Sequence, residues 1–216
     1  MPEFVSFQKI PRLRRKWVVT EKLDGTNASV LIVNIDHDPV SPDDVTAWSS
    51  TDNGDMFALY AGSRNRWITP EDDNYGFARW VAENEEALRV GLGFGTHYGE
   101  WWGAGIQRRY GLQEKRFSLF NVARWHRVGE APYVTESGDP RAGQKLSTEA
   151  PACCHVVPIL YQGMYSGRVI DDTLEELRTV GSAAAPGFMR PEGIVIWHEA
   201  ARQLFKKTLI KDEERK

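Results

Sequence analysis

The chain has 216 residues, which is enough for one domain with a sizeable core. Hydrophobic residues make up 41% of it and charged residues 26%, which excludes a disordered or fibrous protein. The formal net charge of −3 excludes a surface that attracts nucleic-acid phosphates everywhere, so any contact with nucleic acid must come from a local patch.

The cellular compartment is indicated by two features. The only cysteines are the neighbours Cys153 and Cys154, so neither of them has a distant cysteine with which to form a disulfide. This predicts a reducing compartment. The sequence has no N-terminal stretch of the signal-peptide type and no run of 18 apolar residues. We therefore expect a cytoplasmic protein with no membrane partner.

Taken in order, the chain alternates apolar runs with turn-forming residues. Residues 1–16 are basic and interrupted by proline, which fits a solvated loop or a patch for phosphates. Strands are predicted at residues 17–20, 28–35, 45–50, 57–63, 97–102, 117–125, 155–161, 193–197 and 203–209, the last two forming a hairpin. Residues 129–150 are predicted to be a polar surface excursion, and residues 211–216 a solvated tail.

Two helices are predicted. Apolar residues fall at helical spacing in residues 75–90, and Gly91, Gly93 and Gly95 follow as terminators. In residues 171–180, Asp171 or Asp172 is expected as the N-cap, with Gly181 at the C-terminal end. Because strands and helices do not alternate regularly, the sequence predicts a β-rich α+β fold rather than a doubly wound parallel sheet.

Several common site motifs are missing. No Gly-Lys dipeptide occurs, so there is no Walker A phosphate loop. The glycines of residues 91–95 follow a helix, whereas a dinucleotide fingerprint needs a strand before it and a helix after it. No Cys or His pair has zinc-ligand spacing, and no Gly-x-Ser-x-Gly is present.

What remains is a set of charged residues inside apolar strand segments: Lys22, Glu100, Glu192, Lys206 and Lys207. An ionised side chain in such surroundings costs several kcal/mol unless it is paired or bound to a ligand. Each one alone fits a strand end or a salt bridge. Together they predict a cleft with acids and bases, suited to a polyphosphate and its metal.

The segment around Lys22, Glu-Lys-Leu-Asp-Gly at residues 21–25, resembles motif I (Lys-x-Asp-Gly) of the covalent nucleotidyltransferases. These are the ATP- and NAD-dependent DNA ligases, the RNA ligases and the mRNA capping enzymes. Segments similar to motifs III, IIIa, IV and V follow in the expected order, at residues 98–100, 117–122, 192–196 and 204–207. Motif I alone recurs by chance, but five motifs in order are specific.

Within this superfamily the chain is most similar to the ATP-dependent RNA ligases of the RNA ligase 2 and editing-ligase type. Glu21-Lys22 with Gly25-Thr26-Asn27 carries that likeness, as does the arginine segment of residues 62–65. The resemblance implies one α+β nucleotidyltransferase (ATP-grasp-like) domain over residues 1–216, built of antiparallel sheets flanked by helices. Because the chain stops soon after motif V, we expect no C-terminal OB domain, and an accessory protein could take its place.

The resemblance also implies a reaction. Lys22 attacks the α-phosphate of ATP and forms lysyl-AMP, AMP passes to a 5′-phosphate end, and a 3′-OH displaces it to seal the strand. The implied cofactors are ATP as substrate and Mg²⁺ or Mn²⁺. RNA ends or a nicked duplex are the implied partners, and RNA repair is the implied process.

Site roles transfer motif by motif. Glu21 is expected near the adenine edge, with Asn27 as a further nucleotide contact. Arg64 and Glu100 are expected on the ribose or the 3′-end. The ring of Phe120 is expected to stack on adenine, although a plain core role is the alternative. Glu192 is expected to bind both the nucleotide and the metal.

Motif V departs from the family pattern. It often has the form Lys-x-Lys, whereas this chain has Lys206-Lys207-Thr208. Alternate strand residues share a face, so Lys206 and Thr208 point together and Lys207 points away. Both lysines are candidates for the α-phosphate contact, and Lys206 is preferred.

The nucleic acid itself is expected to bind through arginines outside these motifs, namely Arg64, Arg66, Arg108 and Arg109. Two other enzyme types stay open, a minimal ATP-dependent DNA ligase and a capping-type guanylyltransferase. A module that binds nucleotides or RNA ends without catalysis is the alternative from another class. The presence of Lys22, Glu100, Glu192 and Lys206 together argues against it.

Overall fold

The structure is a computed structural model that describes residues 2–130, 134–136 and 144–210. The chain forms two compact units, the first from Met1–Lys22 and Pro158–Lys216 and the second from Leu23–Val157. Both combine mostly antiparallel sheets with helices, so the predicted α+β class is confirmed. The prediction of one catalytic domain over residues 1–216 stays a prediction. Among the described residues, no helix has the length and apolar character needed to cross a membrane.

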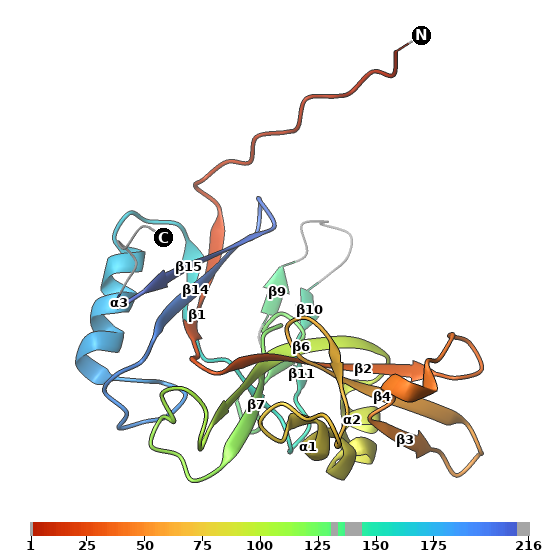
Figure 1. The fold of residues 1–216 in the computed structure, drawn as a ribbon. Helices are drawn as coiled ribbons and strands as arrows, with labels where there is room; N and C mark the ends of the chain where they lie inside the picture. The colour runs from red at the N-terminus through yellow and green to blue at the C-terminus, as the bar shows by residue number, and fades with distance from the viewer. Residues whose placement is uncertain (1, 131–133, 137–143, 211–216) are drawn as a thin grey trace. The chain divides into compact units, whose positions relative to one another are not determined.

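The first unit is a four-stranded antiparallel sheet in the order β13-β1-β14-β15 with one helix (Figure 1). Its elements are β1 (Lys16–Lys22), β13 (Ile159–Met164), α3 (Val169–Val180), β14 (Gly193–His198) and β15 (Gln203–Thr208). Strands β14 and β15 pair directly with each other, which confirms the predicted hairpin.

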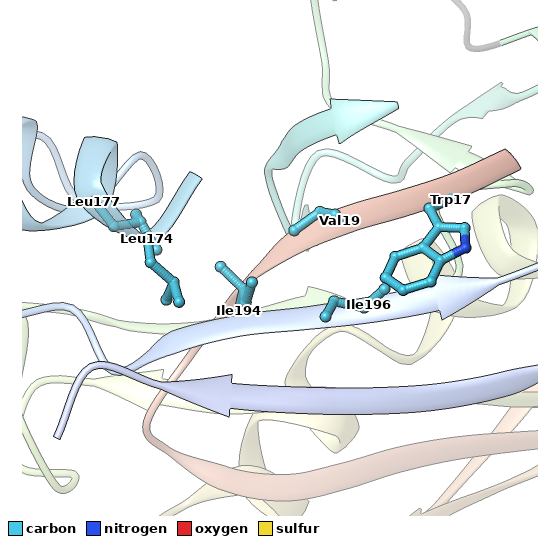
Figure 2. Close-up of a cluster of buried hydrophobic side chains, with 6 residues drawn as sticks. All are labelled: Trp17, Val19, Leu174, Leu177, Ile194 and Ile196. Atoms are coloured by element: carbon cyan, nitrogen blue, oxygen red, sulfur yellow. The ribbon is translucent and has the colours of Figure 1, made fainter. Parts of the chain in front are cut away.

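Helix α3 covers one face of this sheet. Trp17 and Val19 of β1 lie in a buried cluster with leucines of α3 and isoleucines of β14 (Figure 2). The cluster consists of Trp17, Val19, Leu174, Leu177, Ile194 and Ile196. Because side chains alternate along a strand, Val18, Thr20 and Lys22 of β1 point to the opposite face.

The second unit contains a seven-stranded sheet with the path β12-β7-β6-β2-β4-β3, and β5 also pairs with β4. Its strands are β2 (Thr26–Asn34), β3 (Ala47–Ser50), β4 (Met56–Gly62), β5 (Trp67–Ile68), β6 (Gly95–Gly103), β7 (Lys115–Leu119) and β12 (His155–Val156). All of these pairs are antiparallel except β12 with β7.

Short elements complete the second unit. Two small sheets pair β8 (Trp125–His126) with β11 (Thr148–Glu149), and β9 (Val134–Glu136) with β10 (Gln144–Leu146). The helices are the 3-10 turn η1 (Pro42–Asp44), α1 (Phe77–Glu83) and α2 (Glu85–Leu92).

The large sheet has one apolar face and one polar face. Phe77 of α1 packs on Trp101 of β6 and Phe117 of β7, with ring centroids 5.3 and 5.1 Å apart. The residues next to these in each strand point to the opposite, polar face, and the strand pairing places them beside one another. They include Asn27, Ser29, Tyr98, Glu100, Ser118 and Phe120.

Two predicted elements are divided in the structure. The helix predicted at residues 75–90 is two helices, because Asn84 has non-helical angles (φ −117°, ψ 19°) and its side chain donates to Trp80 O at 2.8 Å. The strand predicted at residues 155–161 is β12 and β13, which belong to different units. Pro158 lies between them and has no N–H to continue a ladder.

Other boundaries were also wrong. The strand predicted at residues 117–125 ends at Leu119, where the Asn121 side chain accepts the Arg124 N–H at 3.1 Å and forms a turn. Helix α3 starts at Val169, so Asp171 and Asp172 lie in its first turn rather than at its N-cap. Gly181 does end the helix, with φ +92°. The predicted tail of residues 211–216, and residues 131–133 and 137–143 of the polar excursion, lie outside the described residues.

Candidate active site

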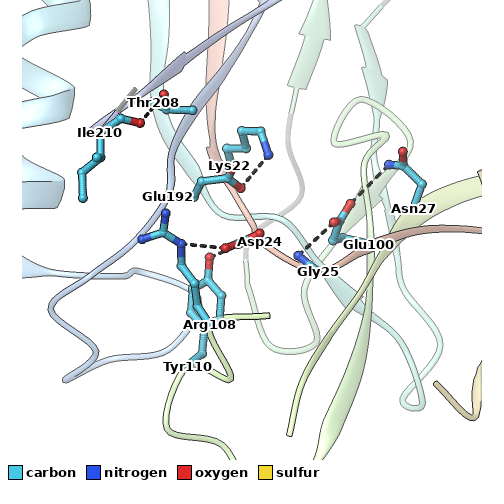
Figure 3. A network of polar contacts seen from close by, with 10 residues as sticks. All are labelled: Lys22, Asp24, Gly25, Asn27, Glu100, Arg108, Tyr110, Glu192, Thr208 and Ile210. Carbon is cyan, nitrogen blue, oxygen red and sulfur yellow. Dashed lines mark hydrogen bonds and ion pairs between the residues drawn. The ribbon is translucent and has the colours of Figure 1, made fainter. Parts of the chain in front are cut away.

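The last residue of β1 is Lys22, and it is paired with a carboxylate. Its Nζ lies 2.5 Å from Glu192 Oε2, and the two side chains are 23% and 16% exposed (Figure 3). Glu192 comes directly before β14, whose first residue Gly193 is opposite Lys22 in the register. A Cβ at Gly193 would lie 2.7 Å from Thr208 Cα, so only glycine allows β15 to approach here. The structure thus joins the predicted motifs I and IV within one sheet.

The two motif V lysines point to opposite faces of the same sheet. Lys206 is opposite Val195, which is in turn opposite Thr20, so Lys206 shares the face of Thr20 and Lys22. Lys207 is opposite Ile194 on the α3 face, and its Nζ lies 3.2 Å from Asp171 Oδ1. This arrangement agrees with the strand argument that preferred Lys206.

Glu21 lies on the α3 face and is almost fully buried, with 1% of its surface exposed. Its Oε1 accepts a hydrogen bond from Ser182 Oγ at 2.6 Å, and its Oε2 accepts one from Ala184 N at 2.9 Å. A buried carboxylate needs such donors. They favour a supporting role, in which Glu21 fixes the segment after α3. The adenine contact that the resemblance implies for Glu21 stays a prediction.

The turn at Asp24 and Gly25 belongs to the second unit and is fixed by three side chains. Arg108 Nε lies 2.7 Å from Asp24 Oδ2, and the Asp24 N–H donates to Tyr110 Oη at 2.9 Å. The Gly25 N–H donates to Glu100 Oε1 at 3.0 Å (Figure 3). The structure thus joins motif I to motif III.

The glycine of motif I is required by space rather than by a special backbone angle. A Cβ at Gly25 would collide with the Trp101 carbonyl oxygen and lie 2.7 Å from Trp102 Cβ. Any side chain would therefore push the turn away from β6. This close approach is what lets the Gly25 N–H reach Glu100.

Asn27, Glu100 and Arg64 form one chain of contacts on the polar face of the large sheet. Asn27 Nδ2 donates to Glu100 Oε2 at 3.4 Å, and Arg64 Nε donates to Asn27 Oδ1 at 3.0 Å. They come from β2, from β6 and from the segment after β4. The structure therefore brings together three residues that the sequence assigned to the nucleotide.

Phe120 follows β7 and is 41% exposed. Its N–H donates to Tyr98 O at 3.0 Å, which continues the pairing of β7 with β6 by one residue. This exposure excludes the core role that was the alternative for Phe120.

Two of the four arginines predicted to bind nucleic acid are held by carboxylates. Arg66 binds Asp72 through both terminal nitrogens, at 2.5 and 3.0 Å, and Arg108 binds Asp24. Arg109 is exposed and has a φ of +60°, which is uncommon for a residue with a side chain. It lies in the loop of residues 104–111, where Gln107 and Tyr110 also have positive φ angles.

A divalent metal would find few protein ligands. Within the described residues, no group of three or more His, Cys, Asp or Glu side chains could hold a metal ion. Mg²⁺ is often bound through only one or two carboxylates plus substrate phosphates. Glu192 fits that use. The Nε2 of His97 is already engaged by Gly93 O at 3.0 Å.

Sequence reasoning missed two residues that hold the site. Tyr110 and Ser182 are far from their partners in the sequence, 86 residues from Asp24 and 161 from Glu21. No motif or periodicity joins such positions. The strained loop that carries Tyr110 contains glycines at 105 and 111, and this is the one sequence signal of an unusual backbone there.

Comparisons with solved structures and with protein families both point to RNA ligases. The structure is similar to an apo mutant of Naegleria gruberi RNA ligase R4a, with 17% identity and a TM-score of 0.51 over 96% of this chain and 57% of that one. Two other Naegleria gruberi RNA ligase mutants follow. The one with ATP and Mn is 17% identical, with a TM-score of 0.49 over 92% of this chain and 50% of that one. The one with AMP and Mn is 16% identical, with a TM-score of 0.47 over 96% and 57%.

At this identity, the first of these likenesses shows a shared fold. The chain spans only 50–57% of the length of these structures. The comparison with curated proteins gives no match. A family model described as RNA ligase matches residues 15–211, nearly the whole chain, and includes all five motifs. The chain therefore belongs to the RNA ligase family.

Proposed function

We propose that this protein is an ATP-dependent RNA ligase whose nucleophile is Lys22. One observation carries the proposal: in a chain of the RNA ligase family, Lys22 Nζ lies 2.5 Å from Glu192, and Lys206 shares its face of the sheet. The ion pair positions Lys22, and once its nitrogen has lost a proton, the amine beside the second cation Lys206 is suited to attack a phosphate. The same lysines and carboxylate would serve a DNA ligase or a capping enzyme, and the match to the RNA ligase family is what favours RNA.

In the first step, Lys22 Nζ attacks the α-phosphorus of ATP. A P–N bond forms, the bond to the β-phosphate oxygen breaks, and pyrophosphate leaves. Lys22 starts as an ammonium held by Glu192 at 2.5 Å, so its nitrogen gives up one proton to become the attacking amine and a second once the P–N bond has formed. The leaving pyrophosphate and water take up these protons. Lys206 stabilises the negative charge that develops on the α-phosphate oxygens.

The remaining steps transfer AMP and seal the strand. The 5′-phosphate of an RNA end attacks lysyl-AMP and frees the lysine, and a 3′-OH then attacks that phosphate and releases AMP. Phe120 stacks on the adenine during these steps, and Asn27, Arg64 and Glu100 hold the ribose or the 3′-end. An RNA break or a nicked duplex supplies both ends, which fits a role in RNA repair. An accessory protein that helps bind RNA is compatible with this scheme.

ATP reaches such a site with a divalent cation on its phosphates. Mg²⁺ or Mn²⁺ neutralises phosphate charge when it is bound. Glu192 is the protein ligand that we assign to it. The same carboxylate holds Lys22. When Glu192 binds the cation that arrives with ATP, it therefore releases Lys22.

The test is covalent labelling. The protein is incubated with Mg²⁺ and with ATP or GTP labelled at the α-phosphate, and then run on a denaturing gel. We expect a labelled band from ATP alone, absent in Lys22→Ala and retained in Lys9→Ala, a control on the exposed N-terminal segment. No label from either nucleotide would contradict the proposal, and a label from GTP alone would favour a capping enzyme.

The nucleic acid is tested separately with nicked duplexes. Matched RNA, DNA and hybrid nicks are compared for sealing by the wild-type protein. We expect sealing of nicks flanked by RNA. Equal or better sealing of an all-DNA nick would contradict the RNA assignment without affecting the labelling result.

A further inference from the structure

Tyr98 has an unusual position for an aromatic side chain. It lies in β6, which is hydrogen-bonded to a strand on each side, yet it is 64% exposed. The neighbouring Trp101 and Trp102 of the same strand are only 2% and 1% exposed. The interior of a sheet usually buries such a ring on one of its faces. A ring left open here is available to a ligand.

The pairing register places Tyr98 beside Phe120. Gly99 is opposite Leu119, so the next pair along the antiparallel ladder is Tyr98 with Phe120, and the Phe120 N–H bonds Tyr98 O. Directly opposite residues have Cβ atoms about 4.5–5.5 Å apart and point to the same face. Phe120 is itself 41% exposed. Two open aromatic rings therefore stand side by side on the polar face.

The other neighbours of Tyr98 are small and covered. On its second side the register places Ser29, which is opposite Gly62. Both are buried, and a Cβ added to Gly62 would collide with Ser29 Oγ and lie 3.0 Å from the ring of Trp67. Along this row the open surface is therefore confined to the rings of Tyr98 and Phe120. Two such rings are suited to flat groups that stack.

Charge on this face favours a nucleic acid as the occupant. Arg64 lies two residues after Gly62 and is held to the face by its Nε bond to Asn27 Oδ1, at 3.0 Å. Asn27 lies in β2, two residues before Ser29. An arginine next to aromatic rings is the combination that binds single-stranded nucleic acid, with the cation on phosphate and the rings on bases.

We propose that Tyr98 stacks on the 5′-terminal base of the RNA strand that receives AMP. This inference rests on the proposed function, in which Phe120 stacks on the adenine of that AMP. In the adenylylated strand the two bases are joined through their riboses and a pyrophosphate. The side-by-side rings of Phe120 and Tyr98 take one base each, and Arg64 keeps its place on the ribose or the 3′-end.

The test separates the reaction steps. Tyr98→Ala is compared with wild type in covalent labelling by ATP, and in sealing of a pre-adenylylated RNA nick without ATP. We expect labelling within about 2-fold of wild type. We expect the KM for the pre-adenylylated RNA to rise roughly 5- to 150-fold, the factor that corresponds to stacking on one base. Tyr98→Phe keeps the ring and is expected to restore the wild-type KM.

The substrate supplies a matched control. A pre-adenylylated nick that lacks the 5′-terminal base cannot stack there, so wild type and Tyr98→Ala are expected to seal it with the same KM. Phe120→Ala is expected to weaken labelling by ATP, whereas Tyr98→Ala is expected to leave it almost unchanged. Thermal unfolding checks that Tyr98→Ala remains folded.

Three results would overturn the inference. One is an unchanged KM for the pre-adenylylated RNA in Tyr98→Ala. Another is an effect of equal size on the abasic substrate, and the third is a raised KM for ATP in labelling, which would make Tyr98 an adenine contact. If the wild-type protein formed no label, the proposed function would fail. Equilibrium binding of the pre-adenylylated RNA to wild type and Tyr98→Ala would still decide the stacking role.

Discussion

At the scale of single residues, Lys206 and Lys207 differ in surroundings rather than in chemistry. They are adjacent and carry the same charge, but β15 turns them to opposite faces of the first unit's sheet. Lys207 is within 3.2 Å of Asp171 on α3, whereas Lys206 shares the face of Lys22. This contrast favours Lys206 for the phosphate contact, which stays a prediction.

We expect Lys206→Ala to slow labelling by ATP about 100- to 1,000-fold, the usual loss when one preorganised charge-stabilising group is removed. Lys207→Ala is the matched control and is expected to stay within about 3-fold of wild type, since its partner is an exposed carboxylate. Single-turnover labelling rates measure both. A larger loss in Lys207→Ala than in Lys206→Ala would reverse the assignment.

A second residue-scale prediction concerns Gly25. We expect Gly25→Ala to lower the free energy of unfolding by about 1–3 kcal/mol, because its Cβ would overlap the Trp101 carbonyl and Trp102 Cβ. Gly167→Ala is the control, because a Cβ there meets nothing within 4 Å. Urea denaturation compares the two variants. Equal stabilities would show that the turn can move away from β6.

At the scale of elements, the sequence predicted the helices and strands that a local pattern of apolar and turn-forming residues marks. The hairpin of β14 and β15 follows two apolar runs with a short polar turn, and Gly181 marks the end of α3. Breaks were missed where one residue acts through its backbone or side-chain bonds. Asn84 divides a periodic helix by capping both halves, and Pro158 divides an apolar run between two sheets.

The site residues follow the same rule. The motifs made Lys22, Glu100 and Glu192 candidates because their order along the chain is recognisable, and their roles stay predictions. The partners of Asp24 could not be predicted, since Arg108 and Tyr110 reach it only after the chain has folded. For the same reason, the burial of Glu21 beside Ser182 has no signal in the sequence.

Helix α3 supplies the element-scale prediction. Leu177 is 2% exposed and packs in the cluster with Trp17, Val19 and Ile194. We expect Leu177→Ala to lower the free energy of unfolding by about 2–5 kcal/mol, from lost burial and the cavity left behind. Val180→Ala on the same helix is the control, because Val180 is 69% exposed and surface changes stay within about 0.5 kcal/mol. Urea denaturation measures the stability of both variants. Equal free energies of unfolding would contradict this packing.

At the scale of the whole molecule, charge decides how RNA is bound. The chain carries a net charge of −3, so phosphate binding depends on local groups of cations that are not neutralised by neighbouring carboxylates. Arg66 and Arg108 are engaged by Asp72 and Asp24, whereas Arg109 is exposed in its strained loop. Arg109 is therefore the arginine outside the motifs that we assign to the RNA backbone.

We expect RNA affinity to fall steeply with salt, and Arg109→Ala to reduce the slope of log K against log salt by about 1. Arg66→Ala is expected to change this slope less, because its guanidinium already binds Asp72. Binding of an RNA nick, measured from low to moderate salt, tests both. Affinity that did not depend on salt would contradict a phosphate-binding surface.

The division of the chain has a consequence for its synthesis. The second unit is one continuous stretch, Leu23–Val157, so it can complete its contacts while the ribosome is still adding later residues. Strand β1 cannot do the same, because its partners β13 and β14 are made after the second unit; Thr20 bonds Val195, 175 residues away. The peptide that carries Lys22 therefore has no sheet partner until β13 and β14 have been made. Lys22 can meet Glu192 only when that residue has also emerged, so a chain that ends before Glu192 cannot form this pair.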